Sequence, residues 1–303
     1  MPELPDVALY LRALEPRIVG NQVTGFVVRS MSVLRTYQPP YEQVVGKTVV
    51  GLRRIGKRIV WEFDHDQLFL VIHLMVAGRL RWHDRAGVKP PGKVGLAAWG
   101  FPGSTLVLTE QGSKRRAGIW VISGEENLAA EDRGGLEPLE ISKDQFIEAL
   151  RGRNHTLKRA LTSQRILSGI GNAYSDEILW EARLSPVKLT TRLTDQEAAR
   201  LHRAVRKVLT SWIQRLSAET GEKWPTRVTA FRPEMAVHGK YGEACPRCGA
   251  PVQRIVYASN ETNYCASCQT GGKLLADRSL SRLLKKDWPK TLEELEDLRG
   301  GSG

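Results

Sequence analysis

Short hydrophobic runs and polar breaks alternate along the first 124 residues of the chain. From residue 22 onward, runs rich in β-branched and aromatic residues are separated by glycine, proline and aspartate. This pattern is typical of strands joined by tight turns, and about eight runs at close spacing favour a two-layer antiparallel sandwich. The clearest runs are VTGFVVRS, KRIVWEF, LFLVIHL, GRLRWH and STLVLTE.

A helical period precedes these runs. Within residues 6–17, the apolar side chains of Val7, Tyr10, Leu11 and Leu14 recur at steps of three and four. Side chains with this spacing share one face of a helix, so the pattern predicts a helix ahead of the first strand.

The helical period returns from residue 142 onward. Ser142 and Thr194 stand where helices begin, and serine and threonine are favoured N-cap residues. We therefore expect an all-helical second domain, whose last long helix carries Leu201, Val205, Leu209 and Ile213 on its buried face. Its segments are SKDQFIEALRG, HTLKRALTS, GNAYSDEILWEARL and LTDQEAARLHRAVRKVLTSWIQRL.

These patterns predict an α+β chain with several domains. We expect a helix and an antiparallel β-sandwich over residues 1–130, a helical domain over 131–236, a cysteine segment over 237–270 and a tail over 271–303. The tail offers one short helix at 275–286 and an acidic stretch, LEELEDL. The closing GGSG is either a native flexible end or an added one.

The charge balance favours a polyanionic partner. Lysine and arginine number 45 against 33 aspartate and glutamate residues, a formal net charge of +12. Cations that bind phosphates release condensed counterions, although a basic protein of another kind would show the same excess. The chain has no apolar run near the ~18 residues of a membrane span. The first ten residues, MPELPDVALY, lack the basic and apolar regions of a signal peptide, so we do not expect one. We therefore expect a cytoplasmic protein of the bacterial cytosol or nucleoid, without a membrane partner.

Four cysteines close to one another predict a metal site. Cys245 and Cys248 form one C-x-x-C pair, and Cys265 and Cys268 form a second. Two such pairs supply the four thiolates of a tetrahedral zinc ion and leave no position open for water. The spacing therefore indicates one structural Zn²⁺. The alternative is four free or disulfide-bonded cysteines, which this spacing disfavours.

Three motifs in a fixed order give a resemblance to a known family. MPELPD begins the chain, GIGNAYSDE lies in the helical zone, and the cysteine segment ends in YCASCQ. Together they resemble the formamidopyrimidine-DNA glycosylase and endonuclease VIII family, over residue 2 to about residue 269. The resemblance implies a helix–two-turn–helix domain with a zinc finger. It also implies a base-excision-repair DNA glycosylase with AP lyase activity, acting on oxidised bases.

The resemblance assigns the chemistry to three residues. Pro2 is the catalytic amine: once Met1 is removed, it attacks the sugar, forms a Schiff base and permits strand cleavage by β- and δ-elimination. Glu3 is the general acid and base, and Lys57, in a turn between two strands, contacts the phosphate near the lesion. Without the family context, Pro2 would be only a processing signal, Glu3 a helix-terminal acid and Lys57 a surface lysine.

The resemblance also implies a set of DNA contacts. Gly169 and Gly171 would let the backbone of a hairpin approach a phosphate at a helix N-terminus. The expected partner is damaged DNA, double-stranded or single-stranded, bound by a monomer. The side chains expected to contact the DNA are His73, Arg115, Arg116, Lys158 and Asn172.

Four positions depart from the family pattern. Asp6 replaces a glutamate, and Asn260 stands where the finger usually carries an arginine. The residues that fill the gap left by a flipped base are usually methionine and phenylalanine; here those positions hold Val76, next to Met75, and Ala117. We call these two positions the wedge. Because Val76 and Ala117 are short, the wedge fills the gap poorly, which predicts that single-stranded DNA is cut about as well as duplex. The loop expected to cover the flipped base, residues 217–234, is shorter than in purine-directed relatives.

The main alternative is a zinc-containing DNA-binding protein that keeps the fold without catalysis. The presence of Pro2, Glu3 and Lys57 together argues against it, because a protein that only binds DNA has no use for them. A zinc ribbon of the helicase or topoisomerase kind is disfavoured, since the chain has no GxxxxGK[ST] loop.

Overall fold

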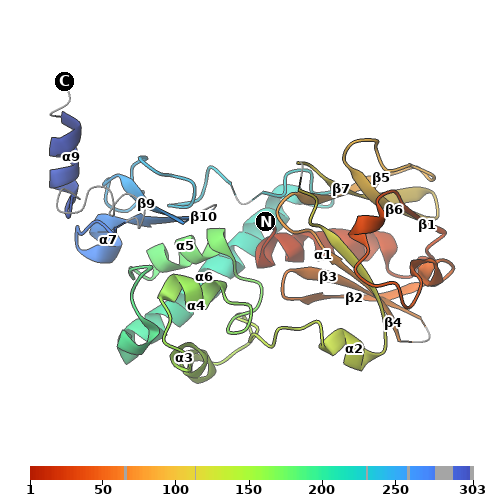
Figure 1. Ribbon diagram of the computed structural model, residues 1–303, viewed down its shortest axis with the longest axis horizontal. Coiled ribbons are helices and arrows are strands. Elements are labelled where there is room, and N and C mark those ends of the chain that lie inside the picture. Colours follow the sequence, from red (N-terminus) through yellow and green to blue (C-terminus); the bar gives the residue numbers. More distant parts are fainter. Residues whose placement is uncertain (65–66, 113, 230, 258–259, 277–288, 301–303) are drawn as a thin grey trace. The chain divides into compact units, whose positions relative to one another are not determined.

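The computed structural model describes residues 1–64, 67–112, 114–229, 231–257, 260–276 and 289–300 (Figure 1). The chain forms two compact units. Unit 1 comprises Met1–Gly135 and Ser211–Ala230, and unit 2 comprises Leu136–Thr210 and Phe231–Gly303. Among the described residues, no helix is both long and apolar enough to cross a membrane.

Unit 1 begins with helix α1 (Leu4–Ile18), which starts two residues before the predicted one. The Asp6 carboxylate accepts a hydrogen bond of 3.0 Å from the backbone N–H of Glu3 and so caps the helix. Val7, Tyr10 and Leu14 are buried, as the pattern predicted, whereas Leu11 is only half-buried. The buried face of α1 packs against strands β2 (Val49–Ile55) and β3 (Arg58–Phe63) of the sandwich.

Two four-stranded antiparallel sheets follow in the described part of unit 1, and they confirm the predicted sandwich. The tryptophans Trp61 and Trp99, fully buried, meet between the sheets with ring centroids 5.3 Å apart. One sheet has the order β1 (Gly25–Val28), β6 (Gly95–Phe101), β7 (Ser104–Glu110), β5 (Gly78–His83); the other has β2 (Val49–Ile55), β3 (Arg58–Phe63), β4 (Leu68–His73), β8 (Gly118–Ser123). The unit also contains short 3-10 turns at Met31–Val33 and Tyr41–Val44 and helix α2 (Glu125–Ala129).

One end of the second sheet gathers the residues that the sequence singled out. Lys57 occupies the two-residue turn between β2 and β3, as predicted. His73 closes β4, where it pairs with Arg58 of β3 on one side and with Gly118 of β8 on the other. The chain segment that carries Arg115 and Arg116 enters β8 at the same end. Antiparallel pairing therefore places three distant segments side by side.

Unit 2 begins with short helices α3 (Lys143–Arg151), α4 (Leu157–Thr162) and α5 (Asn172–Glu181), followed by a 3-10 turn at Thr190–Arg192. Ser142 caps α3, as predicted, by accepting from the Gln145 N–H. Helix α6 (Asp195–Thr220) begins in unit 2 and ends in unit 1. Along α6, Leu201, Val205 and Leu209 are buried as predicted. Ile213, which was also expected on the buried face, is half-exposed, and Trp212 is buried in its place.

The cysteine segment of unit 2 is a small hairpin with a following turn of helix. Strands β9 (Val252–Tyr257) and β10 (Asn260–Cys265) pair antiparallel, and α7 (Ala266–Thr270) follows. The acidic stretch of the tail belongs to α9 (Leu292–Gly300). The helix expected at 275–286 lies outside the described residues from 277 onward.

Candidate active site and nucleic-acid interface

The N-terminal amine of unit 1 lies in a largely buried, charged environment. Burial is the main influence on the Met1 α-amino group and lowers its pKa below the ordinary value. The charges of Glu3 and Asp6 act in the opposite direction, while those of Arg79 and Lys57 lower the pKa further. Pro2 and Glu3 are buried, as is Lys57. The predicted trio of Pro2, Glu3 and Lys57 therefore belongs to one electrostatic neighbourhood.

Asp6 has a structural role that its departure from the family pattern left open. It is fully buried, and its carboxylate caps the helix that carries Pro2 and Glu3 at its start. Its shorter side chain still reaches the Glu3 N–H, so the turn that presents both residues is held from inside the helix.

His73 is present in its neutral form at physiological pH. Burial first, and then the charges of Arg58, Lys57 and Arg133, lower its pKa to about 4. A neutral imidazole can donate one N–H to a phosphate but adds no positive charge. His73 therefore suits an orienting contact rather than an ionic one.

The backbone before β8 is held by a carboxylate that sequence reasoning missed. Glu110, buried at the end of β7, accepts hydrogen bonds from the backbone N–H groups of Arg116 and Ala117, the latter at 3.0 Å. The Arg115 side chain donates to the carbonyl of Lys93. No motif pointed to Glu110, because its partners lie across a turn and a carboxylate at a strand end has many ordinary roles.

Arg79 is the second residue that the sequence did not reveal. It follows Gly78 at the start of β5, and its guanidinium donates to the carbonyls of Gly78, at 2.7 Å, and Val76, at 3.2 Å. These bonds fix a cation whose charge acts on the N-terminal amine. Only the folded sheet brings β5 and the N-terminus together.

The two wedge positions have unlike surroundings. Val76 is 59% exposed and follows Met75, whose φ of 52° is left-handed. Ala117 is only 2% exposed and belongs to the core of the sandwich. The position where the family pattern places phenylalanine is therefore buried in this chain. A residue there cannot reach into DNA without leaving the core.

In unit 2, the hairpin before α5 is fixed from within. Gly169 has a φ of 79°, and its N–H donates to the side chain of Gln164, which in turn donates to the carbonyl of Ile170. Lys158 and Asn172, the expected phosphate contacts, already have protein partners. The Lys158 ammonium donates to the Asn172 carbonyl and to the Asp176 carboxylate. The amide of Asn172 donates to the carbonyl of Glu261, at 2.7 Å.

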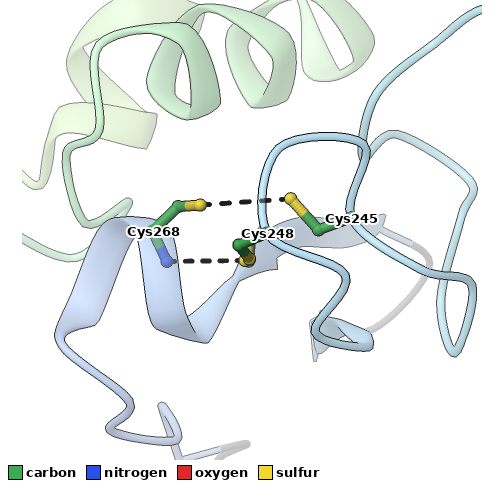
Figure 2. A group of neighbouring side chains, drawn as sticks. Cys245, Cys248 and Cys268 are labelled. Carbon is green, nitrogen blue, oxygen red and sulfur yellow. Dashed lines mark hydrogen bonds between the residues drawn. The ribbon is translucent and has the colours of Figure 1, made fainter.

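The four cysteines converge as their spacing predicted. Their sulfur atoms all lie within 4.8 Å of one another. The Cys245 and Cys268 sulfurs point toward each other at 4.0 Å (Figure 2), and those of Cys248 and Cys265 are 3.4 Å apart. A tetrahedral zinc with Zn–S bonds of about 2.3 Å holds its sulfurs about 3.8 Å apart, so the cluster fits zinc.

The finger packs on helix α5 instead of standing apart. Trp180 near the end of α5 joins the core cluster of Cys245 and Cys265, and its indole N–H lies 3.3 Å from the Cys245 sulfur. The Arg247 guanidinium lies 3.9 Å from the centroid of the Trp180 ring and donates to the Trp180 carbonyl. The hairpin before α5, α5 itself and the finger therefore share contacts within unit 2. Asn260, the position without the usual arginine, is exposed at the start of β10.

Three families of domains match the chain in order. Residues 1–118 match the formamidopyrimidine-DNA glycosylase N-terminal domain, residues 135–222 match the formamidopyrimidine-DNA glycosylase H2TH domain, and residues 242–271 match the zinc finger found in FPG and IleRS. The matched segments cover most of both units.

Known proteins resemble this chain both in sequence and in structure. The formamidopyrimidine-DNA glycosylase of Lactococcus lactis subsp. cremoris is 31% identical over 286 residues, which cover 89% of this chain and 99% of that protein. A crystal structure of a Lactococcus lactis Fpg variant with Fapy-dG containing DNA superposes with a TM-score of 0.78 at 29% identity, covering 89% of this chain and 100% of that one. The complex of Lactococcus lactis Fpg with abasic-site DNA gives a TM-score of 0.78 at 28% identity, covering 88% and 99%.

Proposed function

The chain belongs to the formamidopyrimidine-DNA glycosylase family, and we propose that it excises oxidised bases from DNA through a Schiff base on Pro2 and then cleaves the strand. The observation that carries the proposal is the N-terminal amine. Burial and the charges of Arg79 and Lys57 lower the pKa of the Met1 amine, and the same surroundings favour a neutral, nucleophilic Pro2 amine once Met1 is removed.

The proposed reaction uses the two residues that immediately precede α1, Pro2 and Glu3. The Pro2 nitrogen attacks C1′ of the damaged nucleotide, and the bond to the base breaks with its electron pair leaving on the base. Glu3 protonates the sugar ring oxygen as the ring opens, which leaves an iminium ion at C1′. Loss of the C2′ proton then expels the 3′ phosphate, and a second elimination expels the 5′ phosphate.

DNA is held, in this proposal, by phosphate contacts from both units. Unit 1 contributes Lys57, His73, Arg115 and Arg116 from one end of a single sheet. Unit 2 contributes Lys158 and Asn172 beside the N-terminus of α5, where backbone N–H groups favour an anion. Cys245, Cys248, Cys265 and Cys268 hold one structural zinc, which supplies rigidity and takes no part in the chemistry.

The proposal extends to lesion and location. Fapy-dG and abasic-site DNA are the ligands in the crystal structures of the similar Lactococcus lactis protein, which supports oxidised purines and their abasic products as substrates here. That relative is bacterial, and we propose the bacterial cytoplasm as the place of action, since bacterial DNA lies there.

Borohydride trapping tests the proposal. The processed protein incubated with abasic duplex DNA and borohydride should give a covalent product whose DNA-linked peptide begins at Pro2. Protein with Met1 retained should give little product, because the Pro2 nitrogen is then an amide. A protein that only binds DNA would give none. A product that persists when the N-terminus is blocked, and that maps to a lysine, would refute Pro2 as the nucleophile.

A further inference from the structure

The tail, residues 271–303, is a part of the chain that the proposed chemistry does not use. The Lactococcus lactis subsp. cremoris relative is matched over 99% of its own length by 89% of this chain, and the zinc-finger match ends at residue 271. Most of the tail therefore has no counterpart in that relative. The structure describes the tail over residues 271–276 and 289–300, and the contacts of these two segments indicate its role.

The finger hairpin of β9 and β10 is buried on both of its faces. Successive side chains of a strand point to opposite faces, so the residues of the hairpin form two sets. The set that includes Val252 and Cys265 packs in one cluster with Trp180 of α5. The second set lies on the other face and is no more than 6% exposed; it consists of Gln253, Ile255, Thr262 and Tyr264.

The tail covers this second face. The leucines of the tail that pack against the buried cluster of Ile255 and Tyr264 are Leu274, Leu275 and Leu292. The backbone N–H of Leu275 donates to the Tyr264 hydroxyl at 2.7 Å. The two described segments of the tail are also joined to each other, because the Leu274 N–H donates to the Lys290 carbonyl at 2.8 Å. The hairpin is therefore the middle layer of three, with α5 on one face and the tail on the other.

The start of α9 is held where it meets the finger. The Thr291 hydroxyl accepts from the Glu294 N–H at 3.2 Å, and the Glu294 carboxylate accepts from the Lys290 N–H at 2.6 Å. Bonds of this kind fix the first turn of a helix. They therefore fix the position of Leu292, the first residue of α9, against the hairpin.

The hairpin in turn holds a proposed DNA contact. The Glu261 carbonyl of β10 accepts from the amide of Asn172, the first residue of α5, at 2.7 Å. Arg254 is the only lysine or arginine in the sequence of the two strands, and it is paired with the Glu261 carboxylate at 3.2 Å. The side chains of the hairpin therefore offer a phosphate little unbalanced charge. What the hairpin contributes to DNA binding is the position of the groups bonded to it.

We propose that the tail is a positioning element, which docks on the hairpin through Leu275 and Leu292 and holds the finger in the arrangement that binds DNA. This inference rests on the proposed function, since it needs DNA as the ligand. A hairpin that is free to move has to be ordered when DNA binds, and that ordering costs free energy. A hairpin held between two layers is already ordered, so the docked tail raises the affinity for DNA without a new contact to it.

Leu292→Asp in the full-length protein tests the role of the tail. Aspartate suits the first turn of a helix, so α9 should persist, but its charge disfavours the apolar contact with the hairpin. We expect faster hydrogen exchange of the backbone amides of β9 and β10. Affinity for duplex DNA with an abasic-site analogue should fall between about fivefold and about 150-fold, the usual range for coupling between sites. The rate of borohydride trapping at saturating abasic DNA should match the parent, because Pro2 and Glu3 belong to unit 1.

Three further variants define which feature of the tail matters. Leu292→Met keeps an apolar side chain of similar volume and should behave as the parent does. Glu293→Gln changes the charge of the adjacent, exposed position and should also behave as the parent does. Tyr264→Phe removes only the hydroxyl that accepts from Leu275, and should weaken DNA binding between about twofold and about tenfold.

Hydrogen exchange and DNA binding together decide whether the tail positions the finger. Faster exchange in the hairpin with unchanged DNA affinity would overturn the proposal, as would unchanged exchange in Leu292→Asp. Equal weakening by Glu293→Gln would assign the effect to charge instead of docking. Loss of zinc from Leu292→Asp would show that the tail is needed for the finger to fold and would overturn a positioning role. Trapping reports on the Pro2 chemistry independently, so a failed tail assignment and a failed catalytic assignment give different results.

Discussion

At the scale of single residues, the nucleophile depends on how readily the N-terminal amine loses its proton. A free α-amino group titrates near ~7.7–8.0, so about a tenth to a fifth is neutral at pH 7. At the Met1 amine, which precedes the nucleophile Pro2, burial disfavours the charged form and lowers the pKa, and the cation of Arg79 acts in the same direction. Glu3 and Asp6 oppose this shift. The balance between these charges sets the fraction of reactive amine.

Arg79→Gln is expected to shift the pH profile of trapping to higher pH. The rate of Schiff-base formation rises as pH increases through the pKa of the amine and then levels off. The Arg79 charge lowers the pKa of the Met1 amine, and we expect it to act in the same way on the Pro2 amine that Met1 removal exposes. Its loss should then raise that pKa and slow trapping at neutral pH, with little effect well above pH 8. Single-turnover trapping rates across pH measure the shift.

Arg81→Gln is the matched control for this prediction. It removes the same charge two residues further along β5, where the side chain is exposed. We expect a smaller shift than for Arg79→Gln. Equal profiles for the two variants and the parent would show that Arg79 does not act on the amine.

At the scale of secondary-structure elements, the architecture could be predicted because buried positions leave a pattern of apolar residues in the sequence. Runs rich in β-branched and aromatic residues, such as KRIVWEF, mark strands, and steps of three and four in residues 6–17 mark α1. The cysteine spacing predicted the cluster, because each C-x-x-C pair is a local structure. These features depend on residues that are close together in the sequence, so the sequence alone is enough to predict them.

The residues that escaped prediction depend on contacts between distant segments. Glu110 binds backbone groups across the turn before β8, and Arg79 acts on an amine at the far end of the sequence. Ala117 was expected on a DNA-facing loop, but it precedes β8 on the side that faces the core. On α6, Trp212 is buried and Ile213 is not, since the choice between adjacent residues depends on what packs opposite.

Trp180→Phe is expected to loosen the zinc site. The change removes the indole N–H that lies 3.3 Å from the Cys245 sulfur, but leaves an aromatic ring for Arg247 to stack on. Partners of the metal ligands are commonly worth about tenfold to about a hundredfold in metal affinity. Competition with a chromogenic chelator measures this without any DNA.

Trp212→Phe provides the comparison, because Trp212 belongs to α6 of unit 1. It should retain zinc as the parent does. Zinc retention by Trp180→Phe equal to that of the parent would contradict the proposed role of the indole. Because α5 also carries Asn172 at its start, zinc loss should weaken DNA binding while the sandwich of unit 1 stays folded.

At the scale of the whole molecule, the net charge of +12 makes DNA binding dependent on salt. The cations proposed to bind phosphates are Lys57, Arg115 and Arg116 in unit 1 and Lys158 in unit 2. Each neutralised phosphate contributes about −0.9 to the slope of log K against log salt. Lys158 is already paired with Asp176 and should add little, so we expect a slope of about −3.

Two variants distinguish the contribution of the paired Lys158 to the salt dependence from that of the exposed Arg115. Arg115→Gln should make the slope shallower by about one, whereas Lys158→Gln should lower affinity with little change of slope. Titrations at several salt concentrations measure both. A slope near zero for the parent would exclude binding dominated by phosphates, and equal changes for the two variants would show that the Lys158 charge is not neutralised by Asp176.

The preference for single-stranded or duplex DNA depends on which side chains can fill the gap that a flipped-out base leaves in the helix. Extrusion from a duplex costs a few kcal/mol, and an apolar wedge offsets part of that cost. Val76 is exposed but short, and Ala117 is buried in the sandwich. We therefore expect one lesion to be cut at comparable rates in single-stranded, bubble and duplex DNA, measured in single turnovers.

The two wedge positions predict opposite outcomes when enlarged. Val76→Met lengthens an exposed side chain and should raise cleavage of duplex with little change on single strands. Ala117→Phe overfills a packed core, which typically costs about 1–3 kcal/mol, and should lower the unfolding temperature without any gain on duplex. A duplex preference of about a hundredfold in the parent, about 2.7 kcal/mol, would show that other side chains fill the gap. A duplex gain from Ala117→Phe would show that the segment before β8 leaves the core when DNA binds.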